Sequence, residues 1–200
     1  WEPSRLFEAY ADKPDMPLGY PGPQILTLDP GAMDEFDLIL ELDSAFFIRG
    51  ARETPKALWA IDNHVRDYAD SDADYFFGGH SWGWGSDRKD FHWLPSCYDP
   101  TEHHEIPIIK KTYHMGFFGV MYQHRRELID RLGEHGYLIA GQGVFRAEYN
   151  VAYNQCFMGM CLSARGDVPH RVFENAAQGL LVFADNQPDL AKLGMVDGEN

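Results

Sequence analysis

Residues 165–179 read Arg-Gly-Asp-Val-Pro-His-Arg-Val-Phe-Glu-Asn-Ala-Ala-Gln-Gly, and this stretch decides the fold class. Pro169 suits the first residue of a helix, because its ring presets φ and its missing N–H needs no partner there. Gly179 suits the residue just past the helix end, where a left-handed backbone is common. Leu-Leu-Val-Phe at 180–183 then predicts a buried strand. Loop, helix, turn and strand together form the repeating unit of an α/β sheet.

The start of this predicted helix is a candidate anion site. Its free N–H groups and the helix dipole favour a phosphate or diphosphate, and Arg171 lies in the first turn. Asp167 is placed to cap those N–H groups. Glu174, one turn further on, is a plausible acceptor for sugar hydroxyls. The alternative is an ordinary capped helix with Arg171 and Glu174 as a surface pair, and the residues by themselves leave both interpretations open.

Apolar runs alternate with helical patterns upstream of this unit. We expect strands at 112–120, 137–140 and 157–163, and helices at 123–132 and 147–156. This β-α-β-α-β-α-β order predicts a parallel sheet with right-handed crossovers. Gly119 ends the first of these strands, where a glycine lets the backbone approach a ligand closely.

The N-terminal half also contains short apolar runs. We expect strands near 25–28, 37–43, 55–61 and 74–78, and a further short strand stopped by Pro95. The prolines and glycines of residues 1–24 predict irregular structure. Asp43 and Ser44 follow the second strand, and we interpret them as a solvated strand end. Residues 101–112 are predicted to be a linker.

Asp62 and His64 follow the strand that begins at Pro55, and they are candidate catalytic residues. Histidine is the usual proton shuttle near neutral pH, and a carboxylate can orient it. The alternative is that Asp62 caps a helix starting near His64. The loop at 79–85, rich in Gly and Trp, either stacks on a sugar ring or packs as a hydrophobic plug.

Composition limits the classes of function. The chain has 200 residues, 44% of them hydrophobic, and a formal charge of −14, which disfavours a nucleic-acid partner. We find no signal segment and no apolar run long enough to span a membrane. Three cysteines without C-x-x-C spacing indicate reduced thiols in a cytoplasmic protein. The two ends of the sequence suggest a fragment of a longer protein.

Metal and nucleophile chemistry are weaker hypotheses. His103-His104-Glu105 and the Asp62–His64 pair are the candidate ligand groups, but neither has the spacing of a known metal motif. We therefore expect no catalytic metal and no bound cofactor. We also expect no nucleophilic hydrolase context at Ser81 or Ser163.

Three segments carry a family resemblance: Arg171–Gly179 with its following strand and Asp197–Asn200, the pattern Trp59-x-x-Asp62-x-His64, and Trp93-Leu-Pro95 followed by Asp99-Pro100 and His103. Together they resemble group 1 glycosyltransferases of the GT-B fold, most closely the bacterial branch of CgeB-like, spore-protein-like chains. The chain departs from the family at Gly166, where group 1 members more often carry a second Glu.

The resemblance implies two Rossmann-like lobes, with residues 1–104 a partial acceptor-side lobe and residues 105–200 a donor-binding lobe truncated at its C-terminus. It implies a cytoplasmic, metal-independent hexosyltransferase that moves a sugar from a nucleotide-diphosphate donor to a saccharide, protein or small-molecule acceptor. The alternatives are a non-catalytic nucleotide- or sugar-binding module and a GT-B sugar epimerase. The implied site residues are Asp62 and His64 for catalysis, and Gly119, Arg125, Ser163, His170, Arg171 and Glu174 for the donor.

Overall fold

The computed structural model describes residues 24–27, 34–42, 46–49, 53–136 and 138–198. The expectations for residues 1–23, Leu28, Asp43 and Ser44 lie outside these ranges. The described chain is a mixed α/β fold of Rossmann-like type, with two four-stranded sheets and a two-stranded one. The two-stranded sheet pairs β1 (Gln24–Thr27) with β3 (Phe46–Arg49) in parallel.

The C-terminal sheet has the strand order β10-β9-β7-β8, and its strand pairs are parallel. Its elements follow the chain as β7 (Tyr113–Phe118), α3 (Gln123–Glu134), β8 (Leu138–Gly141), α4 (Arg146–Asn154), β9 (Cys156–Cys161), α5 (His170–Ala177) and β10 (Leu181–Ala184). This confirms the predicted alternation of strands and helices. The first crossover moves outward to β8, and the second returns across β7 to β9.

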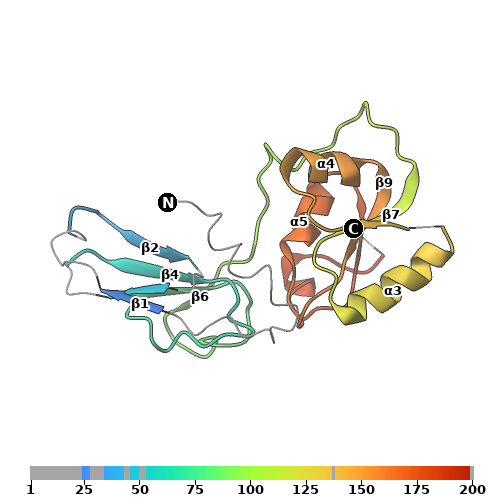
Figure 1. Cartoon of the computed structure of the whole chain (residues 1–200). Coiled ribbons are helices and arrows are strands. Elements are labelled where there is room, and N and C mark those ends of the chain that lie inside the picture. Colours follow the sequence, from blue (N-terminus) through green and yellow to red (C-terminus); the bar gives the residue numbers. More distant parts are fainter. Residues whose placement is uncertain (1–23, 28–33, 43–45, 50–52, 137, 199–200) are drawn as a thin grey trace. The chain divides into compact units, whose positions relative to one another are not determined.

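That reversal places helices on both faces of the sheet, as right-handed crossovers require. Figure 1 shows α3 on one side of β7 and β9, with α4 and α5 on the other. The side chains of β7 divide accordingly, because neighbours on a strand point to opposite faces. Phe117 packs with Ile129 of α3 and Met160 of β9. Phe118 packs against α4.

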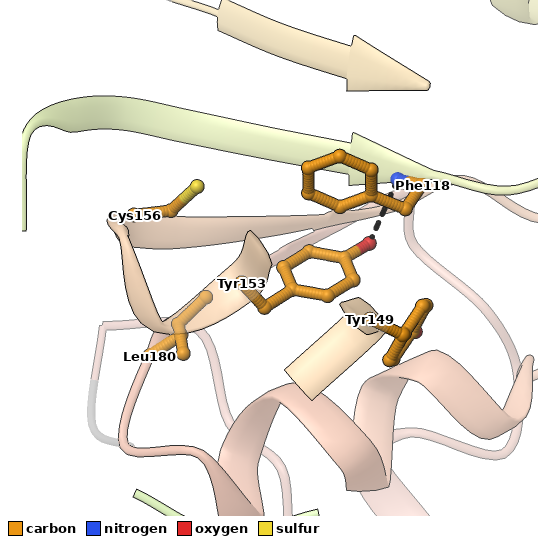
Figure 2. Packing of buried hydrophobic residues seen from close by; sticks show 5 residues of the cluster. All are labelled: Phe118, Tyr149, Tyr153, Cys156 and Leu180. Carbon is orange, nitrogen blue, oxygen red and sulfur yellow. Dashed lines mark hydrogen bonds between the residues drawn. The ribbon is translucent and has the colours of Figure 1, made fainter. Parts of the chain in front are cut away.

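The α4 side of the sheet is held by an aromatic core. Figure 2 shows Phe118, Tyr149 and Tyr153 grouped with Cys156 and Leu180. The ring of Tyr153 meets those of Phe118 and Tyr149 edge-on, both at 4.8 Å between centroids. The Tyr153 hydroxyl accepts a hydrogen bond from the Phe118 backbone N–H at 3.1 Å. This bond satisfies a polar group that would otherwise be costly to bury.

The remaining strands form a sheet in the order β2-β4-β5-β6: β2 (Ile39–Leu42), β4 (Lys56–Ala60), β5 (Tyr75–Gly78) and β6 (Phe91–Trp93). By their contacts, the described residues among 1–58 and 69–75 form one compact unit, and those among 59–68 and 76–200 form a second. The expected division of the chain after residue 104, and the GT-B arrangement, stay predictions.

The first unit contains a buried ionic cluster. The Lys56 ammonium is fully buried, pairs with Asp72 and lies 3.5 Å from the Glu41 carboxylate. Glu41 lies on β2 between Leu40 and Leu42, both of which are exposed. The strand therefore turns its acid inward because a buried lysine needs a counter-charge.

Two local predictions need correction. Residues 61–65 form a turn in place of a helix, so Asp62 does not cap a helix; its backbone carbonyl accepts from the N–H groups of Val65 and Arg66, both at 3.0 Å. Helix α5 begins at His170, with Pro169 as the residue before it. Gly179 does take the expected left-handed backbone, with φ 69°.

Candidate functional site

The C-terminal sheet has one topological switch point, between β7 and β9, where the strand order reverses. In open parallel sheets, ligands bind beyond the carboxyl ends of the strands at such a point. Strand β7 ends at Phe118 and is followed by Gly119, and β9 ends at Cys161 and leads to Ser163. The predicted donor residues Gly119 and Ser163 therefore follow the two strands that border the switch point.

Arg125 forms hydrogen bonds at both of these strand ends. Its side chain is buried, and its guanidinium donates to the Val120 carbonyl at 3.0 Å and to the Leu162 carbonyl at 2.6 Å. Burial, with Arg171 as the second cause, lowers the pKa of Arg125. Two of its nitrogens are thus committed to backbone, so the structure gives Arg125 a supporting role at the strand ends.

Arg171 reaches the same place from the first turn of α5. Its Nε donates to the Phe118 carbonyl at 3.1 Å, and its guanidinium lies 4.6 Å from the centre of the Phe117 ring. Its Nη1 is buried without a hydrogen-bond partner among the described residues. A Cβ added at Gly119 would overlap Nη2 of Arg171. Gly119 therefore makes room for this arginine, which ties the two predicted donor residues together.

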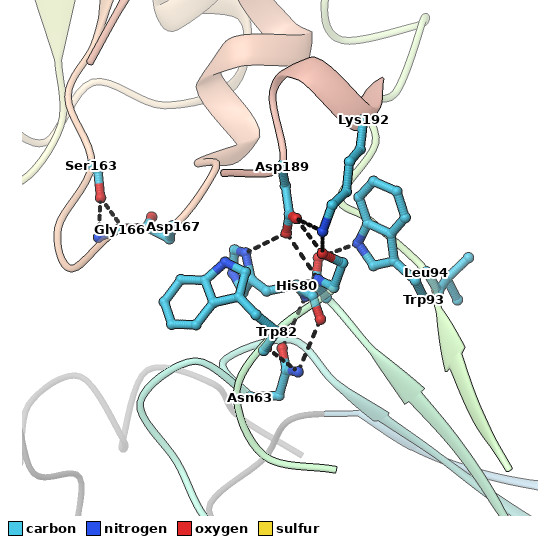
Figure 3. A network of polar contacts seen from close by, with 12 residues as sticks. Asn63, His80, Trp82, Trp93, Leu94, Ser163, Gly166, Asp167, Asp189 and Lys192 are labelled. Carbon is cyan, nitrogen blue, oxygen red and sulfur yellow. Dashed lines mark hydrogen bonds and ion pairs between the residues drawn. The ribbon is translucent and has the colours of Figure 1, made fainter. Parts of the chain in front are cut away.

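The loop from Ser163 to Asp167 is closed by its own hydrogen bonds. Oδ1 of Asp167 accepts from the Ser163 hydroxyl at 2.8 Å and from the N–H groups of Ala164 and Arg165 at 2.7 and 3.0 Å. The Gly166 N–H donates back to the Ser163 hydroxyl at 2.5 Å. Burial by itself would raise the pKa of Asp167, but these hydrogen bonds outweigh it and lower the pKa. Figure 3 shows this turn at Ser163, Gly166 and Asp167.

This finding corrects the expected role of Asp167, which caps its own loop and not α5. Helix α5 has no side-chain cap. By helix geometry the N–H groups of His170 and Arg171 have no intrahelical acceptor, whereas the Val172 N–H donates to the Pro169 carbonyl at 3.0 Å. The predicted anion site at this helix start is therefore limited to the N–H groups of His170 and Arg171, and it stays a prediction.

Glu174, one turn along α5, is held by two neighbours. Its Oε2 accepts a hydrogen bond from the Tyr149 hydroxyl at 2.6 Å, and its Oε1 lies 3.6 Å from Nε2 of His103. Neither Tyr149 nor the role of His103 at Glu174 was expected from the sequence. The positions are separated by 25 and 71 residues from Glu174, so no local spacing signals them.

The turn carrying Asp62 and His64 belongs to the same compact unit as α5. The His64 ring lies 4.3 Å from that of His80 and 5.8 Å from that of Trp82, between centroids. Trp82 in turn borders Gly166, where an added Cβ would lie 3.4 Å from the indole ring. The structure therefore links His64 to the Ser163–Asp167 loop through Trp82.

Asn63, between the two residues singled out from the sequence, organises the loop at 79–85. Its side-chain nitrogen donates to the carbonyls of His80 and Trp82 at 3.0 and 2.9 Å, and its Oδ1 accepts from the His80 N–H at 2.9 Å. The Trp84 N–H donates to the Asn63 carbonyl at 2.7 Å. Asn63 is almost fully buried, and its amide forms the hydrogen bonds that a helix or strand would otherwise give to the backbone of this loop.

A second polar network joins Ser81 to the segment after β10. The buried Asp189 carboxylate accepts from the Ser81 N–H at 2.8 Å and from the Ser81 hydroxyl. Lys192 donates to the same hydroxyl and lies 3.3 Å from the carboxylate. Figure 3 shows Asp189 and Lys192 converging beside His80.

The expectation that Ser81 lacks a hydrolase context is wrong at the level of sequence, because Gly79-His80-Ser81-Trp82-Gly83 fits G-x-S-x-G. The structure still disfavours a nucleophile. The segment forms bends and no helix. The Ser81 hydroxyl is bonded to the Asp189 carboxylate and the Lys192 ammonium, and among the described residues no histidine is bonded to it as a general base. Nδ1 of His80 lies 3.9 Å from Asp189 instead. We interpret the network as a structural tether.

The comparisons leave the function open. No protein-family model and no curated protein matches the chain. Among the described residues, no three His, Cys, Asp or Glu side chains are grouped as a metal site would require. None of the helices in the described part of the chain has the length and apolar character needed to cross a membrane.

Proposed function

We propose that this chain is a glycosyltransferase that takes a sugar from a nucleoside-diphosphate donor at the carboxyl ends of β7 and β9. The observation that carries the proposal is the position of Arg171. Its guanidinium lies at the topological switch point of a parallel sheet, in the first turn of an uncapped helix, with one buried nitrogen lacking a partner. A diphosphate would supply the acceptor oxygens that this nitrogen lacks.

The chemistry needs charge stabilisation more than proton transfer. As the bond from sugar to phosphate breaks, the departing nucleoside diphosphate gains negative charge. Donors already aimed at that charge lower the barrier, and this is commonly the largest catalytic term. The donors here are Nη1 of Arg171 and the N–H groups at the start of α5. These donors need no metal ion.

The sugar acceptor would face the turn at Asp62 and His64. His64 reaches the Ser163–Asp167 loop through Trp82, as its ring distances show. A neutral imidazole there can take the proton of an acceptor hydroxyl if the reaction inverts configuration. Its neighbour His80 stays neutral near pH 7, because burial, followed by His64, lowers the pKa of His80 to about 4.

The finer parts of the proposal follow the resemblance to CgeB-like chains. They are two lobes of GT-B type, a cytoplasmic location, and Glu174 as the acceptor for ribose hydroxyls. His170, exposed at the first position of α5, would face the donor phosphates from solvent. The net charge of −14 leaves this cluster of Arg171 and helix N–H groups as a local exception to an acidic chain.

Turnover of a panel of UDP-, GDP- and ADP-sugars tests the proposal. Wild-type protein should release nucleoside diphosphate, and Arg171→Ala should lower that rate at least a hundredfold. Arg126→Ala is the matched control, because Arg126 is the exposed neighbour of Arg125 on α3. Arg126→Ala should keep the wild-type rate. Equal loss of turnover and folded protein in Arg171→Ala would argue for a purely structural arginine.

The product separates the alternatives. A new glycosidic bond supports a transferase, whereas a donor recovered with an inverted hydroxyl supports a GT-B epimerase. If a donor binds but no donor is turned over, whether or not a mixture of simple saccharide acceptors is present, the result supports a non-catalytic binding module.

A further inference from the structure

The Glu174 carboxylate is held in one orientation by contacts that the donor site itself does not need. The Tyr149 hydroxyl donates to Oε2 at 2.6 Å, a length typical of a hydrogen bond to a charged acceptor. Nε2 of His103 faces Oε1 at 3.6 Å. Each oxygen of the carboxylate thus has its own neighbour, and the two neighbours come from different segments.

Tyr149 is a committed donor. Its side chain is buried on α4, and burial, with Tyr153 and Glu174 as further causes, raises the pKa of Tyr149 far above its usual range. The phenol therefore keeps its proton at every physiological pH. Among the described residues, its hydroxyl donates to the Glu174 carboxylate.

His103 is held in place as firmly. Its ring meets that of Tyr149 edge-on at 5.6 Å, and Nε2 of the fully buried Gln178 lies 3.4 Å from its Nδ1. The residues that follow it are fixed to α4, where the Asn154 side chain accepts from the Ile106 N–H at 2.7 Å and donates to the His104 carbonyl at 3.1 Å. These contacts place His103 beside Glu174 of α5.

From this geometry we infer that Tyr149 and His103 are positioning residues that present Oε1 of Glu174 to a ribose hydroxyl, which makes the site selective for ribonucleoside over deoxyribonucleoside diphosphates. Tyr149 donates to Oε2, whereas Nε2 of His103 lies beyond hydrogen-bond distance from Oε1, so Oε1 keeps an acceptor position for the sugar. The inference rests on the proposed function, because it needs a nucleotide bound at α5. It adds that Tyr149 and His103 fix the orientation of the Glu174 carboxylate, and that the site distinguishes ribonucleotides from deoxyribonucleotides.

Calorimetric titration with UDP, GDP and ADP, each paired with its 2′-deoxy counterpart, tests this inference. Wild-type protein should bind one ribonucleotide about tenfold more tightly than its deoxy form, as loss of one hydrogen bond to a charged group predicts. Tyr149→Phe should reduce that ratio below threefold while leaving the Kd of the deoxynucleotide unchanged. Tyr153→Phe is the matched control, since it also removes a hydroxyl from the same helix and the same core. That hydroxyl accepts a hydrogen bond from the Phe118 backbone N–H.

His103→Asn provides a second variant on a less buried position, should Tyr149→Phe fold poorly. It should lower the ribose preference in the same direction. A ratio in Tyr149→Phe and His103→Asn equal to that of wild type, with Arg171→Ala still weakening binding at least tenfold, would overturn this inference and leave the proposed function standing. Loss of the ratio in Tyr153→Phe as well would assign the effect to core packing and overturn it too. Failure of wild-type protein to bind any nucleotide would overturn both.

Discussion

Replacing Arg125 with methionine tests the inference that this arginine holds the two strand ends together. Methionine keeps the apolar stem and removes the guanidinium, which donates to the Val120 and Leu162 carbonyls. A hydrogen bond with a charged partner contributes about 1.5–3 kcal/mol. Val120 is exposed, so water can replace its bond, whereas Leu162 is buried and its carbonyl loses its donor. Relief of the buried charge and of the nearby Arg171 offsets part of the loss. We expect a net destabilisation of about 1–3 kcal/mol.

Urea and thermal unfolding followed by circular dichroism measure this effect. A loss of that size corresponds to a fall in Tm of about 2–12 °C in a chain of this length. Arg126→Met, at the adjacent exposed position, should stay within about 0.5 kcal/mol of wild type. An Arg125→Met variant as stable as Arg126→Met would refute the reasoning, because the guanidinium would then contribute nothing to the strand ends.

Three further outcomes follow from packing and charge. Gly159→Ala should lower the free energy of unfolding by about 2–4 kcal/mol, because the new Cβ would overlap the buried side chain of Asn175. Gly133→Ala, at an open helical position, should raise that free energy by up to about 1 kcal/mol. Urea unfolding compares the two variants. Asn63→Ala should raise proteolytic cleavage within residues 79–85, mapped by mass spectrometry, and an unchanged pattern would contradict its role in that loop. Because burial, followed by His64, lowers the pKa of His80 to about 4, the unfolded chain binds a proton between pH 6.5 and 4 that the folded chain does not. Stability should therefore fall by about 2 kcal/mol from pH 7 to 5, and His80→Gln should lose most of that slope in unfolding titrations at both pH values.

The C-terminal sheet could be predicted from the sequence because its signals are local. Apolar runs, helical periodicity and Gly179 mark each element within a window of a few residues. The parallel order and the helices on both faces then follow from the handedness of crossovers. Strand β3 was missed, since Phe46–Arg49 is four residues long and lies close to the strand before it.

The site could be predicted only where its residues are neighbours in sequence. Gly119 and Arg171 lie 52 residues apart and were each singled out, but nothing in their local patterns shows that the arginine fills the space over the glycine. The pair Ser81–Asp189 spans 108 residues, and its polar character gives no sign of a partner at that distance. The role of Asp167 was predicted wrongly, because a carboxylate before a helix usually caps that helix, whereas here the preceding loop bonds the carboxylate.

Equilibrium binding of nucleoside diphosphates to wild-type, Arg171→Ala and Arg126→Ala protein is the most direct measurement of whether the β7–β9 switch point is a diphosphate site. We predict that one of UDP, GDP and ADP binds wild type and Arg126→Ala alike, and binds folded Arg171→Ala at least tenfold more weakly. Equal affinity in all three proteins, or no binding of any of these nucleotides to wild type, would contradict the assignment.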